Sequence, residues 1–137
     1  MDTRPREGQT QYDIREIYDA ETGVLRIRQV RLNGKLHSPP SDEPSHAAYD
    51  SQGRPISFDW HNEGVHHRTT GPSTIIFDVP SGIHAIETFE LYGEPRPRAL
   101  GPWVICRDRK TNEISKQEYA QDPPHPGLDE PSSVEPG

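Results

Sequence analysis

Residues Asn62 to Gly82 read NEGVHHRTTGPSTIIFDVPSG and contain two elements that recur along the chain at intervals of about 30 residues. The first is a Pro six residues before an Asp, at Pro44/Asp50, Pro72/Asp78 and Pro102/Asp108. The second is a Gly eleven residues before another Gly, at Gly23/Gly34, Gly53/Gly64 and Gly82/Gly93. A period of this length indicates stacked supersecondary units. Each unit would bury its apolar face only against its neighbours.

Each unit is predicted to start with a short strand that ends at an Asp, as in HAAYD, TIIFD and VICRD, with REIYD as a less regular first copy. These segments mix β-branched and aromatic residues over strand-like lengths. A turn follows and reaches Gly23, Gly53, Gly82 or Asn112. Asp50, Asp78 and Asp108 are expected to accept backbone N–H bonds in these turns. That role accounts for them better than a row of catalytic carboxylates does.

A second strand closes on the next Gly and carries a predicted core column. The residues four positions before that Gly, with one extension of the register, are Val30, Trp60, Phe89 and Tyr119. In the second unit, alternation predicts Ile56, Phe58 and Trp60 on one face, with Ser57, Asp59 and His61 on the other. The first unit keeps this alternation only with a bulge, which is predicted near Arg28 and Gln29.

The predicted fold is all-β: an antiparallel meander of about eight strands built from tandem hairpin repeats of about 30 residues. The repeat domain spans 12–120, with units at about 12–40, 41–68, 69–98 and 99–120. Residues 1–11 are polar, and residues 121–137 hold four acids, no base and five prolines. Both ends are predicted to be disordered tails. No pattern predicts a long helix.

The strings NEGVHHRTTGPSTIIFDVPSG and YGEPRPRALGPWVICRDRKTN resemble MORN-type β-hairpin repeats. They are more closely similar to the NGK-x-HR-x-x-GP repeats of bacterial and phage proteins. The resemblance covers roughly residues 12–120. It implies contact with a protein or a membrane surface through a sheet face, and some related repeats have antitoxin-like roles. The first unit departs from the pattern, because SDEPSHAAYD replaces the GP dipeptide. The last unit lacks its closing NG, so both end units are expected to be caps.

Composition limits the classes of function. Only 29% of the 137 residues are hydrophobic, and the net charge is −7. Without the acids and bases of 1–11 and 121–137, the body has 16 acids and 13 bases. It therefore lacks the strongly basic surface of a protein that binds the phosphate backbone. A single cysteine, Cys106, excludes an intrachain disulfide framework. The sequence has no secretion signal and no apolar run long enough to span a membrane, so a cytoplasmic location is expected.

No motif predicts catalysis. A GxSxG elbow, an HExxH or CxxC motif and a phosphate-binding loop are all missing from the sequence. His61, His66 and His67 lie within seven residues, and a metal-dependent hydrolase using them is one alternative. His37 and His67 share a repeat position, so a structural role across each turn is simpler. We therefore expect a protein that is not an enzyme and that has no cofactor or metal.

The function predicted first is a non-enzymatic module that binds another protein, as a bacterial or phage inhibitor, immunity or adaptor protein. The predicted binding residues are Trp60, His61, Arg68, Trp103 and Arg107. Trp103 is expected to be exposed if Ile105 and Arg107 face solvent, where it would serve as an aromatic anchor. The alternative partner is a nucleic acid, bound through two basic clusters. These comprise Arg26, Arg28, Arg31 and Lys35 in the first unit, and Arg96, Arg98, Arg107, Arg109 and Lys110 in the last. The sequence does not decide the oligomeric state.

Overall fold

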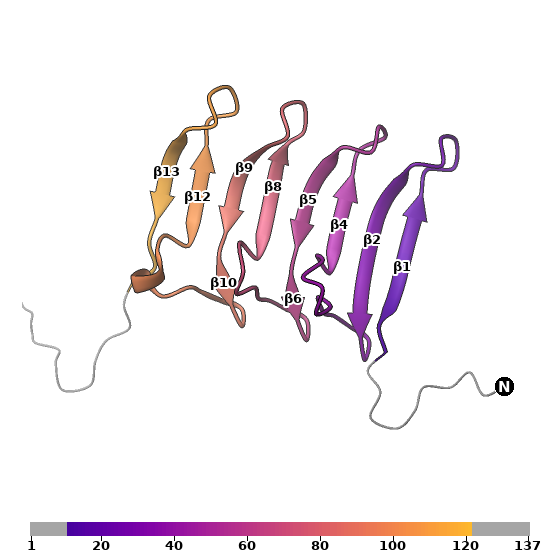
Figure 1. Ribbon diagram of the computed structural model, residues 1–137, viewed down its shortest axis with the longest axis horizontal. Coiled ribbons are helices and arrows are strands. Elements are labelled where there is room, and N and C mark those ends of the chain that lie inside the picture. Colours follow the sequence, from indigo (N-terminus) through magenta and orange to yellow (C-terminus); the bar gives the residue numbers. More distant parts are fainter. Residues whose placement is uncertain (1–10, 122–137) are drawn as a thin grey trace, which may run out of the picture.

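The computed structural model describes residues 11–121. Their main strands form one antiparallel sheet and follow one another in chain order (Figure 1), and two short hairpins form separate two-stranded sheets. The strands are β1 (Asp13–Tyr18), β2 (Leu25–Leu32), β4 (His46–Tyr49), β5 (Pro55–Asp59), β8 (Thr74–Asp78), β9 (Ile83–Thr88), β12 (Val104–Arg107) and β13 (Ile114–Glu118). The predicted all-β meander of about eight strands is confirmed. The predicted disordered tails lie outside the described residues, apart from Gln11 and Gln121 at their borders.

Short two-residue strands extend the lower ends of the hairpins. They are β3 (Lys35–Leu36), β6 (His61–Asn62), β7 (Val65–His66), β10 (Glu90–Leu91) and β11 (Glu94–Pro95). A crossover segment then leads to the next unit: residues 37–45, 67–73 and 96–103 form the first, second and third crossovers. The third contains a 3₁₀ turn, Arg98–Leu100. Within 11–121 no helix is long and apolar enough to cross a membrane.

A turn joins the two main strands of each hairpin and lies at the top of the sheet in Figure 1. Each of these upper turns contains an Asp and a residue with positive φ. Gly53 and Asn112 have φ values of 85° and 66°, in the left-handed region that Gly and Asn accept. Asp50 Oδ1 accepts hydrogen bonds from the backbone N–H groups of Gln52 and Arg54, at 2.9 and 2.8 Å. These bonds lower the pKa of Asp50. Asp108 is held in the same way by Lys110 and Thr111. The predicted turn role of the aspartates is therefore confirmed.

One bulge per hairpin lies at the same place in all four units. The paired positions skip one residue of the second strand each time, and the skipped residues are Arg26, Ile56, Ala85 and Ser115. The bulge predicted near Arg28 and Gln29 is therefore two residues too far along the chain. Ile56 stands at a bulge and is 36% exposed, so it does not continue the alternation of Phe58 and Trp60.

The crossovers lie on one side of the sheet, which we call the crossover face. Cross-strand pairing places Ala47, Phe58, Ile75, Glu87 and Ile105 in one row on this face. The core column lies one row below. Val30 and Trp60 are 1% and 4% exposed and Phe89 is half-buried, whereas Tyr119 is 42% exposed. The prediction of a core position for Tyr119 is therefore wrong. Tyr119 follows the edge strand β13, beyond which the described chain has no further unit to cover it.

The lower hairpin tips bind one another through backbone atoms and histidines. Glu63 N–H donates to His37 Nδ1 at 3.1 Å, and Tyr92 N–H donates to His67 Nδ1 at 2.9 Å. The N–H of Gly64 donates to the carbonyl of Leu36 at 2.8 Å. Each histidine thus belongs to one unit and binds the tip of the next. The predicted structural role of His37 and His67 is confirmed.

Candidate functional site

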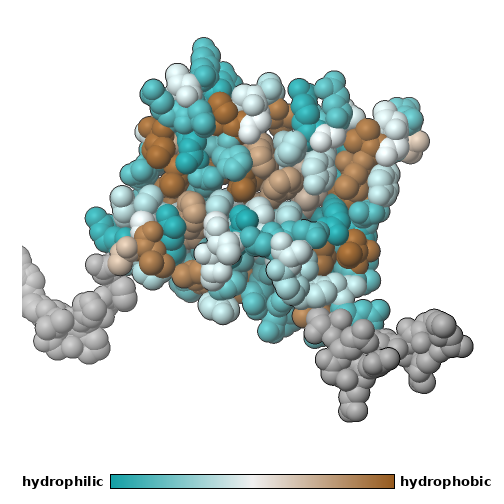
Figure 2. Space-filling view, in the orientation of Figure 1, coloured by the Kyte–Doolittle hydropathy of each residue, from teal (hydrophilic) through white to brown (hydrophobic). Residues whose placement is uncertain are grey.

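An aromatic cluster lies on the upper part of the crossover face. Its rings are Tyr49, Phe58 and Phe77, from β4, β5 and β8, with Tyr49 and Phe58 5.8 Å apart and Phe58 and Phe77 5.1 Å apart between ring centroids. All three are half-buried, and the sheet is a single layer with no second layer over this row in the described chain. In the space-filling view, hydrophobic residues form separate patches among hydrophilic ones (Figure 2). Aromatic side chains are enriched where proteins bind one another.

A buried carboxylate adjoins this cluster. Glu87 is 8% exposed and accepts hydrogen bonds from Arg107 Nη1 at 2.5 Å and from His84 Nδ1 at 2.8 Å. The ring of His84 contacts Phe77 edge-on at 5.0 Å. Burial opposes ionisation of Glu87, but the hydrogen bonds from Arg107 and His84 outweigh it and lower the pKa of this carboxyl. The edge of the aromatic cluster is therefore formed by the ionised Glu87 carboxylate, which Arg107 and His84 hold in place.

Two arginines stack on the lower aromatic residues of the crossover face. The guanidinium carbon of Arg68 lies 3.7 Å from the Trp60 ring centroid, and that of Arg96 lies 3.8 Å from the Phe89 centroid. Arg68 Nη1 donates to the Pro72 carbonyl, and Arg96 Nε donates to the Pro102 carbonyl. The second and third crossovers are thus each fixed to the sheet by one cation–π contact, and a hydrogen bond within the crossover holds the arginine in place.

The Gly of each Gly-Pro dipeptide makes room for these arginines. A Cβ on Gly71 would lie 2.9 Å from Arg68 Nη1, and a Cβ on Gly101 would lie 2.8 Å from Arg96 Nη2. Both distances are too short for a side chain to fit without a shift. The first crossover has neither this Gly nor a stacked Arg, and its column residue, Val30, has no ring. The Gly-Pro dipeptide therefore accompanies the Arg-aromatic stack.

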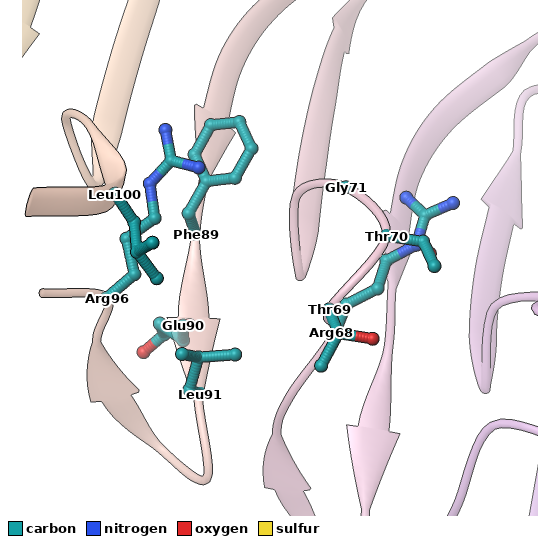
Figure 3. Close-up of a pocket in the computed structure, with 9 residues that line it drawn as sticks. All are labelled: Arg68, Thr69, Thr70, Gly71, Phe89, Glu90, Leu91, Arg96 and Leu100. Atoms are coloured by element: carbon teal, nitrogen blue, oxygen red, sulfur yellow. The ribbon is translucent and has the colours of Figure 1, made fainter.

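A pocket of about 390 Å³ lies between the second and third crossovers, and Phe89 is among its lining residues. Figure 3 shows Arg96 over the Phe89 ring on one side and the Arg68–Gly71 segment on the other. Leu100 of the third crossover adds an apolar side chain. The pocket lining thus combines two arginines, an aromatic ring, aliphatic groups and one acidic residue, Glu90.

A polar network occupies the opposite face of the sheet. His66 Nε2 and Asp59 Oδ1 are 3.1 Å apart, and Thr74 Oγ1 also donates to Asp59, at 3.0 Å. The rings of His61 and His66 are 4.4 Å apart, and His61 Nδ1 lies 2.6 Å from Ser45 Oγ. Burial lowers the pKa of His61 to about 4, whereas the hydrogen bond with Asp59 raises the pKa of His66. The network is a set of mutually satisfied groups.

The histidine trio proposed for a metal hydrolase does not converge. His67 packs on Tyr92, with 4.0 Å between ring centroids, while His61 and His66 pack on each other. In residues 11–121, no three or more His, Cys, Asp or Glu side chains are grouped so that they could hold a metal ion. The described residues therefore give the metal-dependent alternative no support.

The five predicted binding residues occupy different environments. Trp60 and His61 are buried, at 4% and 8% exposed, so a partner cannot contact them directly and we withdraw both as contact residues. His61 lies on the predicted face with Asp59, but it is buried there because its ring packs against His66 and its Nδ1 lies 2.6 Å from Ser45 Oγ. Arg68 stacks on the Trp60 ring and forms an ion pair with Asp42. Arg107 borders the aromatic cluster through Glu87.

Trp103 lies apart from the aromatic cluster. It is half-buried and lines a shallow hollow with Arg98 and Tyr119 at the β13 edge. Ile105, two residues along, is only 9% exposed. The condition under which Trp103 would be exposed, an outward-facing Ile105, is therefore not met.

Sequence reasoning missed the aromatic cluster, although its signal was available. The residue directly before each turn Asp is Tyr18, Tyr49, Phe77 or Arg107. Alternation from Ala47 and Ile75, the buried residues two positions earlier, places Tyr49 and Phe77 on the crossover face. Three aromatic residues at one repeat position indicate a surface shared between units.

Most of the basic side chains proposed for nucleic-acid binding have acidic or carbonyl partners. Arg26 pairs with Asp19 at 3.3 Å, and Arg28 pairs with Glu16 and Glu43 at 3.4 and 2.9 Å. A paired guanidinium is less available to phosphate, because binding would first break its existing contacts.

No family model, curated protein or solved structure matches the chain.

Proposed function

We propose that the protein is a non-enzymatic binding module that docks another protein on its aromatic cluster. The observation that carries the proposal is the row of Tyr49, Phe58 and Phe77 on an uncovered half of a single-layer sheet. Its rings are fixed by contacts with one another, so little side-chain entropy is lost when a partner covers them. An inhibitor, immunity or adaptor role in a bacterium or phage is the form of this function that the repeat pattern suggests.

The chemistry of the surface specifies the partner. The cluster is shared by three strands on one sheet face, which suits a broad protein surface better than a small ligand, since ligand sites are concave. The Glu87–Arg107 pair at its edge supplies both signs of charge. A partner should therefore place an apolar patch over Tyr49 and Phe77, with polar groups at the rim around Arg107.

The test compares neighbouring positions on the two faces. Phe77→Ser and Tyr49→Lys change the aromatic cluster, whereas Ile76→Ser changes an exposed residue on the opposite face of the same strand. A protein captured from host lysate by the full chain is identified and purified, and its Kd is measured by calorimetry for each variant. We expect the two cluster variants to weaken binding at least about tenfold, the loss of 1.4 kcal/mol or more.

Ile76→Ser should leave the affinity unchanged. Circular dichroism and thermal melting of each variant check that the sheet is intact. A partner that binds the cluster variants and the full chain with equal affinity would contradict this function.

A further inference from the structure

The two edge strands of the sheet, β1 and β13, each pair with only one neighbouring strand among residues 11–121. Their unpaired sides lie at opposite ends of the sheet (Figure 1). Natural proteins often protect such an edge with a proline or with a covering element. Neither strand contains a proline, and every residue of both strands is exposed. Each edge therefore presents backbone groups that a further strand could pair with.

The chain already contains three junctions of the kind that these edges could form. At each junction, the second strand of one unit pairs with the first strand of the next: β2 with β4, β5 with β8, and β9 with β12. β5 and β9 carry bulges at Ile56 and Ala85, like that of β13 at Ser115, so the bulge does not prevent pairing. β13 is the second strand of the last unit, and β1 is the first strand of the first. A second copy of the chain therefore offers each edge the strand that the repeat would place there.

The register of the three junctions fixes how β13 would meet β1 of a second copy. The pairs at one position are Gln29 with His46, Asp59 with Thr74, and Thr88 with Val104. Arg15 takes the place of Val104, because each lies four residues before the Asp of its upper turn. Glu118 takes the place of Thr88, because each pairs with the residue four before the turn Asp of its own hairpin. The same register therefore places Glu118 opposite Arg15 of the second copy.

This register position already carries polar contacts between units. Two of the three junctions hold a side-chain hydrogen bond here: Gln29 Nε2 with His46 Nδ1 at 3.3 Å, and Thr74 Oγ1 to Asp59 Oδ1 at 3.0 Å. Opposite charges on directly opposed residues stabilise an antiparallel pair of strands, and like charges destabilise it. Arg15 and Glu118 are such a pair, and neither forms an ion pair within residues 11–121 of its own chain.

The adjacent backbone position shows the same complementarity. The N–H groups of Val30, Trp60 and Phe89 donate across the junctions to the carbonyls of Ser45, Ser73 and Trp103, at 2.8, 2.8 and 2.7 Å. Tyr119 is the next member of this column, and its N–H has no acceptor among residues 11–121. Ile14 takes the place of Ser45 in the first unit, so its carbonyl is the acceptor that the repeat would supply. Ile14 and Tyr119 are both exposed, and the junction would cover both side chains.

We propose that copies of this protein associate head to tail, with β13 of one copy paired antiparallel to β1 of the next and Glu118 opposite Arg15. The contact joins two different surfaces, so it leads to a ring or to an open filament of copies. The area of one strand pair is small, so the association should be weak and should depend on protein concentration. The crossover face stays free, so the proposal goes beyond the protein-binding function and does not depend on it.

The first test measures self-association of the full chain and locates it. Sedimentation velocity covers protein concentrations from about 10 μM to about 1 mM, because small interfaces belong to weak complexes. We expect the mean mass to rise over this range. In NMR spectra over the same range, the amide signals of β1 and β13 should shift, and those of β5 and β8 should not. A chain that stays monomeric throughout, or shifts that centre on β5 and β8, would overturn the proposal.

Charge variants test the register. Arg15→Glu and Glu118→Arg each place like charges opposite one another and should weaken self-association by about threefold to tenfold. The double variant has opposite charges in reversed order and should recover the natural affinity. Arg109→Glu makes the same charge change at an exposed upper turn and should leave self-association unchanged. Thermal melting checks that each variant is folded. An equal loss from Arg109→Glu and Arg15→Glu would show that only the net charge matters, which would contradict the register.

A mixture of the two single variants tests the direction of the contact. The Arg15→Glu chain keeps the natural β13, and the Glu118→Arg chain keeps the natural β1. Both junctions between unlike chains therefore hold opposite charges, and we expect the mixture to associate as strongly as the natural chain. A symmetric contact between two β1 strands or two β13 strands would respond to only one of the substitutions. That response, or a mixture no stronger than the single variants, would overturn the head-to-tail arrangement.

Discussion

The two intervals between successive crossovers each hold an arginine stacked on an aromatic ring, but an ion pair to that arginine is present only in the first. In the first, Trp60 supports Arg68, and Asp42 neutralises the guanidinium. In the second, Phe89 supports Arg96 and Glu90 lines the pocket, but no ion pair joins Arg96 to an acidic side chain of residues 11–121. The difference shows how a repeat array can leave a binding feature in one unit. The stacked pair is kept in both intervals, and Asp42 adds an ion pair only in the first.

The largest effect on stability is expected at Trp60, the aromatic residue of the first interval. Trp60→Ala should lower the free energy of unfolding by roughly 3–5 kcal/mol, as for other large core truncations. Phe89→Ala should cost less, because Phe89 is half-buried beside an open pocket. Urea unfolding measures both. Equal costs for the two variants would contradict the difference between the intervals.

His61 should make the stability of the fold sensitive to acid. Its pKa is about 4 in the folded state and about 6.5 when unfolded, so the unfolded chain binds the proton more readily. Stability should therefore fall as the pH drops below about 6.5, by about 1–2 kcal/mol between pH 7 and pH 5. His66 has a raised pKa and acts in the opposite direction.

His61→Gln removes the titration of His61 but keeps His66. Urea unfolding at pH 7 and pH 5 should show a smaller loss of stability for this variant than for the natural chain. An equal loss in both proteins would mean that His61 does not cause the acid sensitivity.

Gly71→Ala tests whether the glycine serves the arginine. The added Cβ would displace the Arg68 guanidinium, and we expect a loss of about 1–2 kcal/mol, as for overpacking in other cores. In an Arg68→Ala background the same substitution should cost little. A double-mutant cycle by urea unfolding gives the coupling. Independent, additive costs would show that Gly71 is needed for another reason.

The smallest effect is expected at an arginine outside both intervals. Arg26 pairs with Asp19 on the surface and donates to the Tyr49 carbonyl. Arg26→Ala should change stability by about 0.5 kcal/mol or less, because exposed ion pairs contribute little. It is the matched control for Arg68→Ala, which removes a cation–π contact and a paired carboxylate. A larger loss from Arg26→Ala would contradict the importance given to the crossovers.

Local chemistry made the turns and the strand order predictable. Gly23, Gly53 and Gly82 recur where positive φ is required, and an Asp precedes each turn, so the hairpins and their period follow from the sequence. The position four residues before each closing Gly also gave Val30 and Trp60 as core residues. It failed for Tyr119, because burial there depends on a next unit.

The crossovers were not predictable from periodicity. They contain no regular alternation, and their path depends on contacts between units such as Asp42 with Arg68. A bulge shifts the alternation by one residue, which misplaced Ile56. His61 lies on its predicted face but is covered by His66, a contact within the same hairpin that periodicity does not show. The candidate surface was thus found only in part, since Trp60 and His61 are buried and Arg68 and Arg107 are engaged within the fold.

The difference between the two intervals is tested most directly by NMR of the arginine side chains. The account predicts that Arg68 Nε–H shows ring contacts to Trp60 and Arg96 Nε–H shows ring contacts to Phe89. It also predicts that Asp42→Asn shifts the Arg68 signal and leaves the Arg96 signal in place. Missing ring contacts, or an equal response of both arginines to Asp42→Asn, would contradict it.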